Sequence, residues 1–188
     1  MGDRDGMYLL QGSVEMDEAF FGSPDKGGKR GRGSDKTPVI VGLSFNAYGK
    51  PGYIHAKVLD AVTGESVVKF AAETVEKGST ILSDGLPAYN KLASNGYIHQ
   101  PKNFNPDKEP EHLKWVHVII SNIKAFITGT YHGLGDKHLQ AFLDEFCYRF
   151  NRRFWQEQLF ARTLAACVSS GKYTRHQLIM VSRDSRIH

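Results

Sequence analysis

Two aspartates in this 188-residue sequence stand where carboxylates can do chemistry. Asp17 lies inside the alternating segment Ser13–Phe21, and Asp84 directly follows the short apolar segment Ser79–Ser83. Carboxylates that converge on one point supply the hard oxygen ligands that Mg²⁺ or Mn²⁺ requires. Such ligands can also hold two ions roughly 3.5–4 Å apart, an arrangement that serves phosphoryl transfer.

Each aspartate also has a purely structural interpretation. An Asp-Gly pair after a strand, as at Asp84 and Gly85, is common in turns and at helix N-caps. Asp17 with Glu18 fits a solvated sheet edge equally well. Glu15 shares the strand face of Asp17 by the two-residue period, so it is either a supporting acid or another solvated residue.

The hydrophobic pattern predicts the elements that position these acids. Alternating or β-branched segments predict five strands: Ser13–Phe21, Pro38–Phe45, Tyr53–Leu59, Ser79–Ser83 and Tyr97–Gln100. Helical spacing predicts five helices: Gly64–Lys77, Leu86–Ala93, Leu113–Thr128, Asp136–Arg153 and Glu157–Ser169. Three strands in a meander, followed by alternating helices and strands, indicate an α/β fold with a mixed five-stranded sheet. The ribonuclease H-like fold shares this order, which makes the strands of Asp17 and Asp84 neighbours.

Charge is distributed unevenly along the chain. The net charge is only +4, but residues 26–36 carry a net +4 and residues 149–188 a net +6, which leaves −6 for the remainder. Basic segments of this kind favour a polyanionic partner, most simply nucleic acid. A solvated basic loop has the same composition, so charge alone leaves both interpretations open.

The cysteine content and the lack of long apolar segments narrow the class of protein. Cys147 and Cys167 are too few for a disulfide framework or a four-thiolate zinc site, and they fit a reducing cytoplasm. No apolar run approaches the roughly 20 residues of a membrane span, and the first residues have no signal-peptide pattern. We therefore expect a cytoplasmic protein without a membrane partner.

Three segments together resemble the catalytic domain of a bacterial insertion-sequence transposase family: VEMDEAFFG, ILSDGLPAYNKL and WVHVIISNIKAFITGTYHGLGDKHLQAFLDEFCYRFNRR. The third segment is the most specific, and the resemblance covers roughly residues 12–170. That family has a ribonuclease H-like core and an Asp-Asp-Glu or Asp-Asp-Asn set. The resemblance implies DNA strand cleavage and strand transfer with Mg²⁺ or Mn²⁺, as two ions, on element ends and target DNA.

Carried over by position, the resemblance implies Asp17 and Asp84 as metal-binding aspartates and Asn122 as the third ligand. It places Lys124 on a phosphate or a DNA end. Helical geometry conflicts with this set, because Asn122 and Lys124 are 200° apart on an unbroken helix and cannot both face the metals. Either the helix starts late or one of the two is exposed, and an N-cap is the structural alternative for Asn122.

Six cations are expected to contact the DNA backbone: Lys29, Arg30, Arg32, Arg149, Arg152 and Arg153. The three arginines of the later group alternate with aromatic residues at a helix end. Arginines that complete a helix C-terminus have the same pattern.

We expect one catalytic domain over residues 1–172 and a tail over residues 173–188 that the resemblance does not reach. Family members usually carry a cysteine-rich zinc ribbon ahead of the core, whereas sixteen residues without cysteine precede Asp17 here. The chain is therefore expected to be a catalytic fragment or the product of a decayed element, with homo-oligomerisation left open. The alternatives are a DNA-binding remnant that cannot cleave and a stand-alone ribonuclease H-like nuclease.

Overall fold

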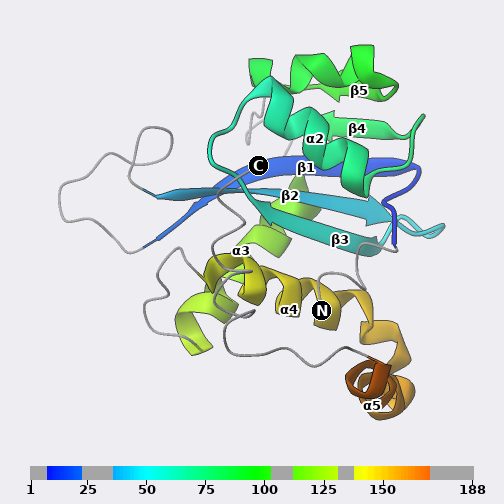
Figure 1. Ribbon diagram of the computed structural model, residues 1–188. Coiled ribbons are helices and arrows are strands. Elements are labelled where there is room, and N and C mark those ends of the chain that lie inside the picture. Colours follow the sequence, from blue (N-terminus) through cyan, green and yellow to red (C-terminus); the bar gives the residue numbers. More distant parts are fainter. Residues whose placement is uncertain (1–7, 23–35, 103–111, 131–137, 170–188) are drawn as a thin grey trace.

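The computed structural model describes residues 8–22, 36–102, 112–130 and 138–169 of the chain. Five strands form one mixed sheet in the order β3-β2-β1-β4-β5 (Figure 1). The strands are β1 (Ser13–Phe21), β2 (Thr37–Phe45), β3 (Pro51–Val58), β4 (Thr80–Ser83) and β5 (Ile98–Pro101). β1, β2 and β3 form an antiparallel meander, and β4 and β5 run parallel to β1. The expected mixed five-stranded sheet is confirmed.

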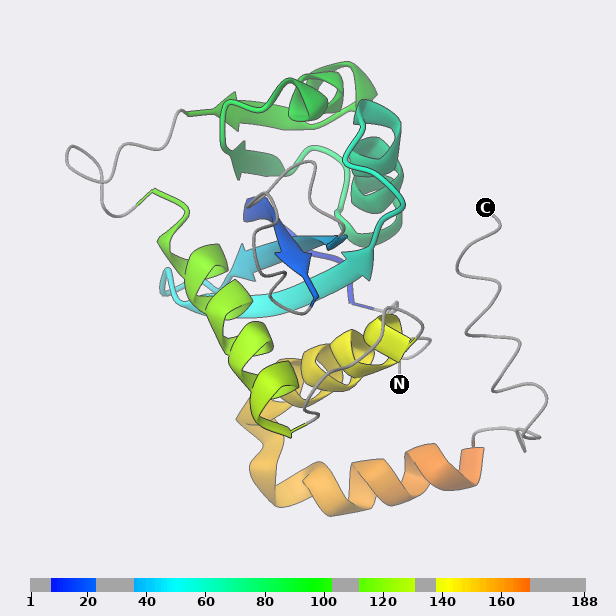
Figure 2. The same cartoon turned by 90° about the vertical axis from the view of Figure 1, so that its left-hand side faces the viewer.

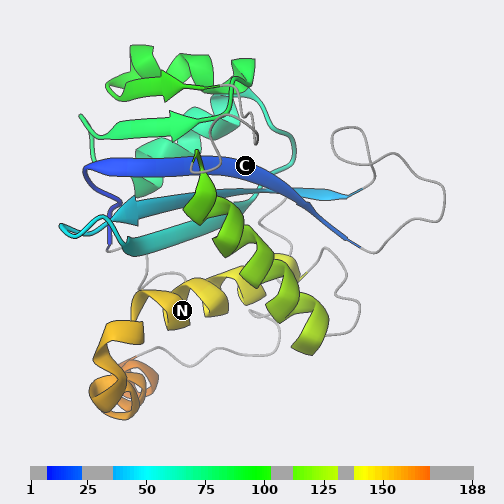
Figure 3. The ribbon, with the colours of Figure 1, turned by 180° about the vertical axis from the view of Figure 1, so that it is seen from behind.

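Helices cover both faces of this sheet. The helices of the described residues are α2 (Gly64–Thr74), η1 (Pro87–Asn95, a 3₁₀ helix), α3 (Lys114–Thr130), α4 (Leu139–Asn151), η3 (Arg153–Gln158, also 3₁₀) and α5 (Leu159–Ser169). α2 and η1 lie on one face, whereas α3 crosses the other face diagonally and α4 runs beside β3 (Figures 1 and 3). α5 extends beyond α4, away from the sheet (Figure 2). Within the described ranges, no helix has the length and apolar character needed to cross a membrane.

Two hydrophobic clusters hold these layers together, one on each face of the sheet. Ala19 and Phe21 of β1 belong to the cluster under α3 and α4. Val14 and Met16 of β1 belong to the cluster under α2 and η1. Because successive strand residues point to opposite faces, odd-numbered residues of β1 face α3 and even-numbered ones face η1. This alternation decides where the acidic residues of β1 point.

The observed ends of two predicted helices illustrate how element boundaries differ from the expected ones, and a tertiary contact explains the first. The first helix was expected to reach Lys77, but α2 ends at Thr74 because Val75 is extended. Val75 forms a parallel bridge with Leu10, and Thr74 O accepts a hydrogen bond of 2.8 Å from Leu10 N–H. The long helix expected over Asp136–Arg153 is α4, which ends at Asn151, while residues 136 and 137 lie outside the described part.

Candidate metal centre

The acidic residues of the site lie where β1 continues past the end of β4. The parallel pairing of β1 with β4 covers Ser13–Glu15 of β1 and stops there. Asp17 and Glu18 follow on β1, and Asp84 follows directly after β4. The end of β4 therefore brings Asp84 beside the continuing edge of β1, and two distant parts of the sequence meet.

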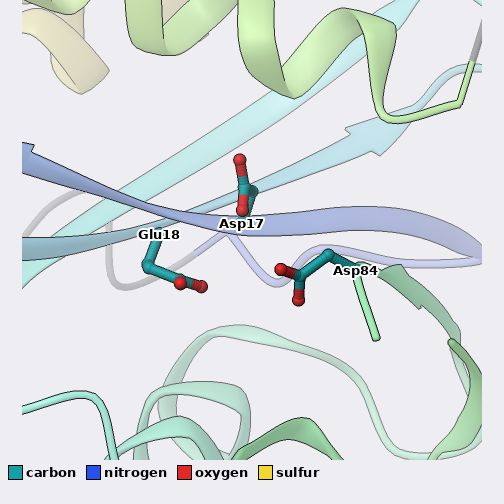
Figure 4. Close-up of side chains that lie close together, drawn as sticks. All are labelled: Asp17, Glu18 and Asp84. Atoms are coloured by element: carbon teal, nitrogen blue, oxygen red, sulfur yellow. The ribbon is translucent and has the colours of Figure 1, made fainter. Parts of the chain in front are cut away.

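One carboxylate oxygen from each of Asp17, Glu18 and Asp84 lies within 4.8 Å of the other two. Figure 4 shows Asp17 pointing to the α3 side of β1 and Glu18 to the opposite side, with Asp84 beside them. All three side chains are half-buried. Three negative charges this close repel one another unless a cation neutralises them. Carboxylate oxygens are the ligands that Mg²⁺ and Mn²⁺ prefer, so the donor set fits such an ion.

On the α3 side, Asp17 borders an open hollow of about 550 Å³. Its polar lining includes Asp17, Glu18, Lys36, His117, Ser121 and Lys124. His117 Nε2 lies 3.2 Å from Asp17 Oδ2, and this hydrogen bond raises the pKa of His117 above its usual value. The Lys124 ammonium lies 5.5 Å from the centroid of the Phe21 ring. The hollow thus combines oxygen ligands for a metal with cations that suit phosphate groups.

On the η1 side, Glu18 is held by a buried tyrosine. The Tyr89 hydroxyl donates a hydrogen bond of 2.9 Å to Glu18 Oε2. Burial, together with the neighbouring charges of Glu18 and Asp17, raises the pKa of Tyr89 well above 10, so its hydroxyl stays a donor. The Tyr89 ring also stacks against His99 of β5, with ring centroids 6.4 Å apart. These contacts fix one oxygen of the Glu18 carboxylate.

Asp84 takes part in the turn after β4 as well as in the acidic cluster. Its Oδ1 accepts a hydrogen bond of 3.0 Å from Leu86 N–H, the contact of an Asx turn. The preceding residue, Ser83, is fully buried, and its hydroxyl lies 2.8 Å from His99 Nε2. The turn interpretation and the metal interpretation of Asp84 are therefore compatible, because the turn contact occupies one position on one oxygen.

Glu15 connects β1 to the start of α3. Its side chain is buried, and its Oε2 accepts a hydrogen bond of 2.7 Å from Val116 N–H. Burial raises the pKa of Glu15, while the Val116 hydrogen bond opposes that effect. A carboxylate at a helix N-terminus is stabilised by the free N–H groups and the helix dipole. The sequence left two interpretations of Glu15 open, a supporting acid or a solvated residue, and its burial agrees with the first. Its hydrogen bond to Val116 N–H connects the start of α3 to the strand that carries Asp17.

The structure does not bring Asn122 to the aspartates. Asn122 is exposed and borders a different hollow of about 310 Å³, beside Trp115 and Phe154. Lys124 borders the hollow of Asp17 instead. α3 begins at Lys114 and runs through both positions, so the two side chains point to different sides at about 100° per residue. The role expected for Asn122 as a metal ligand therefore stays a prediction, and the acidic residue that lies beside the two aspartates is Glu18.

Two of the expected DNA-binding arginines are engaged within the fold. Arg152 is 5% exposed, with its guanidinium 3.7 Å from the centroid of the Tyr148 ring. Arg153 donates to the carbonyl oxygens of Pro51, Gly52 and Phe150. Both guanidinium groups thus make contacts within the fold, and the expectation that they bind DNA stays a prediction.

The other expected cations differ in how far the structure describes them. Arg149 is exposed and pairs with Glu145 at 3.6 Å on the same helix. Lys29, Arg30 and Arg32 lie outside the described residues. Arg149 therefore remains available to a partner at the molecular surface, since an exposed pair of this type is weak.

Sequence reasoning missed Glu18, Tyr89 and His117 as parts of the site. Glu18 was interpreted only as part of a solvated edge, because the strand period places it on the opposite face from Asp17. Tyr89 lies five positions after Asp84 in the segment that carries the resemblance, which is the one local signal for it. On α3, Ser121 follows His117 by four positions and Lys124 follows it by seven, a helical spacing that groups all three on one face.

Comparisons with known proteins add independent information. No curated protein matches the sequence. Among the solved structures that match is a chain of the simian T-cell lymphotropic virus intasome in complex with PP2A regulatory subunit B56 gamma, at 15% identity and a TM-score of 0.46. The match covers 72% of this chain and 48% of that one, so the chain spans about half the length of this structural relative.

The family comparison covers most of the chain. The ISXO2-like transposase domain matches residues 9–151. This range begins just before β1 and ends with α4, so it includes the whole sheet and the three acidic residues that converge at its edge. The sheet order, the acidic cluster and this match agree with the resemblance found in the sequence. The chain belongs to the ISXO2-like transposase domain family.

Proposed function

We propose that this domain cuts DNA strands and transfers the cut ends to new DNA positions, with a divalent metal held by Asp17 and Asp84. The observation that carries the proposal is the convergence of these two carboxylates at the edge of β1, although 67 positions separate them in the sequence. The family to which the chain belongs supports DNA as the substrate. We propose Mg²⁺ or Mn²⁺ because the cluster offers only carboxylate oxygens.

Five residues in or beside the hollow have a role in this proposal. When bound, the metal supplies the positive charge that activates the attacking oxygen and stabilises the leaving one. Asp17 and Asp84 bind it, and His117 orients Asp17 through their hydrogen bond. Lys124 and Lys36 border the same hollow and contact the phosphates of the bound strand as point charges.

DNA binding by cations extends beyond the hollow in this proposal. The exposed Arg149 and the basic run of residues 26–36 add backbone contacts that do not depend on DNA sequence. Binding is therefore expected to weaken as salt rises, because each phosphate contact releases condensed counterions.

Metal-dependent nicking of supercoiled plasmid DNA tests the proposal. The full chain is expected to nick the plasmid with Mg²⁺ or Mn²⁺ and to lose nicking in EDTA. Asp17→Asn and Asp84→Asn are expected to reduce the rate by more than about 100-fold, because losing a direct ligand exceeds the roughly 10–100-fold effect of losing a supporting group. Glu76→Gln, a matched change at an exposed acid, is expected to nick as the wild type does.

Parallel substrates separate this function from its alternatives. Joining of a labelled oligonucleotide 3′ end to the plasmid supports strand transfer, whereas hydrolysis of an RNA–DNA hybrid without joining indicates a stand-alone nuclease. Salt-sensitive DNA binding without any metal-dependent nicking indicates a remnant that cannot cleave. Undiminished nicking by both aspartate variants contradicts the proposal.

A further inference from the structure

The third ligand of the metal centre is the part of the site on which the sequence and the structure differ. The family resemblance points to Asn122, yet that side chain borders the hollow of Trp115 and Phe154. A neutral amide oxygen is also a weaker ligand for a hard dication than a carboxylate oxygen. A third donor must therefore come from residues that already lie beside Asp17 and Asp84.

Glu18 meets this requirement by its position on β1. It faces the η1 layer and Asp17 faces the α3 layer, so an ordinary strand in the middle of a sheet would keep their carboxylates apart. Here the β4 pairing stops at Glu15, and both side chains reach the edge of β1 from opposite faces (Figure 4). An oxygen of Glu18 then lies within 4.8 Å of one from Asp17 and one from Asp84.

Tyr89 holds Glu18 in this position from outside the acidic cluster. The tyrosine is fully buried and its hydroxyl donates to Glu18 Oε2 at 2.9 Å. A carboxylate accepts at several sites on two oxygens, so this contact leaves acceptor positions for a metal. Groups that orient a ligand in this way are a regular part of metal sites.

We propose that Glu18, held by the Tyr89 hydroxyl, supplies the third oxygen ligand of the metal centre and that Asn122 lies outside the metal shell. The inference rests on the proposed function, since it concerns the metal of that site. Glu18 is a ligand in it, and Tyr89 is a positioning residue that acts through Glu18.

Direct Mn²⁺ binding tests the inference without relying on activity. The full chain is titrated with MnCl₂, and the free ion is followed by electron paramagnetic resonance. Glu18→Gln removes the charge with little change of shape and is expected to weaken Mn²⁺ binding by about tenfold or more, because affinity depends on the number of charged ligands. Tyr89→Phe is expected to weaken it by about tenfold, as the loss of an orienting group does.

The chain offers a matched control for each change. Tyr97 is buried, and its hydroxyl makes no hydrogen bond within the described residues, so Tyr97→Phe removes a phenolic hydroxyl without touching Glu18. Glu76→Gln repeats the charge change at an exposed position. Both controls and Asn122→Ala are expected to bind Mn²⁺ as the wild type does. Circular dichroism in EDTA checks that each variant is folded. If Tyr89→Phe does not fold, the Mn²⁺ affinity of Glu18→Gln alone tests the inference.

The outcomes separate this inference from the function on which it rests. Wild-type Mn²⁺ affinity in Glu18→Gln, or a loss in Asn122→Ala as large as that in Glu18→Gln, overturns the inference. In that case, loss of Mn²⁺ binding in Asp17→Asn and Asp84→Asn still supports the proposed function. Unchanged Mn²⁺ binding in those two aspartate variants overturns the proposed function itself.

Discussion

Around the acidic cluster, individual buried polar groups are matched to specific partners. The Ser83 hydroxyl lies 2.8 Å from His99 Nε2, directly beneath the turn that carries Asp84. Tyr89 donates to Glu18 on the same side of the sheet. Because an unpartnered buried polar group costs about 1–3 kcal/mol, these pairs keep the ends of β1 and β4 in one arrangement.

His99 is expected to make stability depend on pH. Burial lowers its pKa below the usual value of about 6.5, so the folded protein keeps the ring neutral while the unfolded chain binds a proton first. The stability contribution is therefore fully present above about pH 6.5 and is lost as pH falls towards the folded pKa. Urea unfolding in EDTA at pH 7.5, 6.5 and 5.5 measures this loss.

His99→Gln is the control for this pH effect. The glutamine amide can still hydrogen-bond to the Ser83 hydroxyl, as donor or acceptor, but does not titrate. The wild type is expected to lose more unfolding free energy than the variant between pH 6.5 and pH 5.5. A difference between the two proteins that stays constant across the whole pH range contradicts the prediction.

At the scale of elements, α4 protects the outer edge of the sheet. Asn151 accepts from Ile54 N–H at 2.8 Å and donates to Ile54 O at 3.0 Å, as a neighbouring strand would. Gln140 makes similar contacts with Val58 N–H and Ala56 O, at 2.8 and 3.2 Å. Two side-chain amides thus satisfy backbone groups of β3 that an exposed edge would leave open to other chains. Gln140 and Asn151 both belong to the segment that carries the family resemblance most specifically. In the structure, these two residues stabilise the fold.

Asn151→Ala is expected to lower the unfolding free energy by about 2 kcal/mol or more. The substitution leaves a buried N–H and a buried C=O of β3 unsatisfied, at about 1–3 kcal/mol each. Asn151→Asp is expected to be at least as destabilising, because it removes the donor and buries a charge. Urea unfolding measures both variants.

Asn90→Ala, at an exposed position of η1, is the control and is expected to stay within about 0.5 kcal/mol of the wild type. If Asn151→Ala and Asn90→Ala are equally stable, α4 does not hold the β3 edge as described.

At the scale of the whole molecule, the sheet with α2, α3 and α4 forms the stable unit, and α5 stands apart from it (Figure 2). No α5 residue belongs to either hydrophobic cluster of the described structure. Phe160 is 80% exposed and Leu164 is 54% exposed. Burial of apolar surface is the main favourable term in folding, so α5 contributes little to the stability of the part of the fold that holds the acidic cluster.

Replacing both exposed residues of α5 is therefore expected to leave the fold intact. The double variant Phe160→Gln, Leu164→Gln is expected to keep its unfolding free energy within about 1 kcal/mol of the wild type, because exposed substitutions usually change it by up to about 0.5 kcal/mol each. Ile123→Ala, in the fully buried part of α3, is the contrasting variant and should lose about 2–5 kcal/mol. A loss of that size in the double variant shows that α5 supports the core.

The sequence by itself determined the order of the elements and much of their extent. The strand expected over Ser13–Phe21 has those bounds in the structure, and the buried stripe of α3 includes the expected Val116, Ile120 and Ile123. These features are local, because periodicity depends on the geometry of a single strand or helix. The element order then indicated that the strands of Asp17 and Asp84 are neighbours.

Only the tertiary structure decided which side chains share the site. The position of Glu18 depends on where the pairing of β4 with β1 stops. That Asn122 and Lys124 border different hollows depends on how α3 is rotated against the sheet. Arg152 lies over the Tyr8 ring and Arg153 donates to Gly52 O because the end of α4 packs beside other parts of the chain. Such contacts join residues dozens of positions apart. They depend on packing between elements, which the local hydrophobic period does not specify.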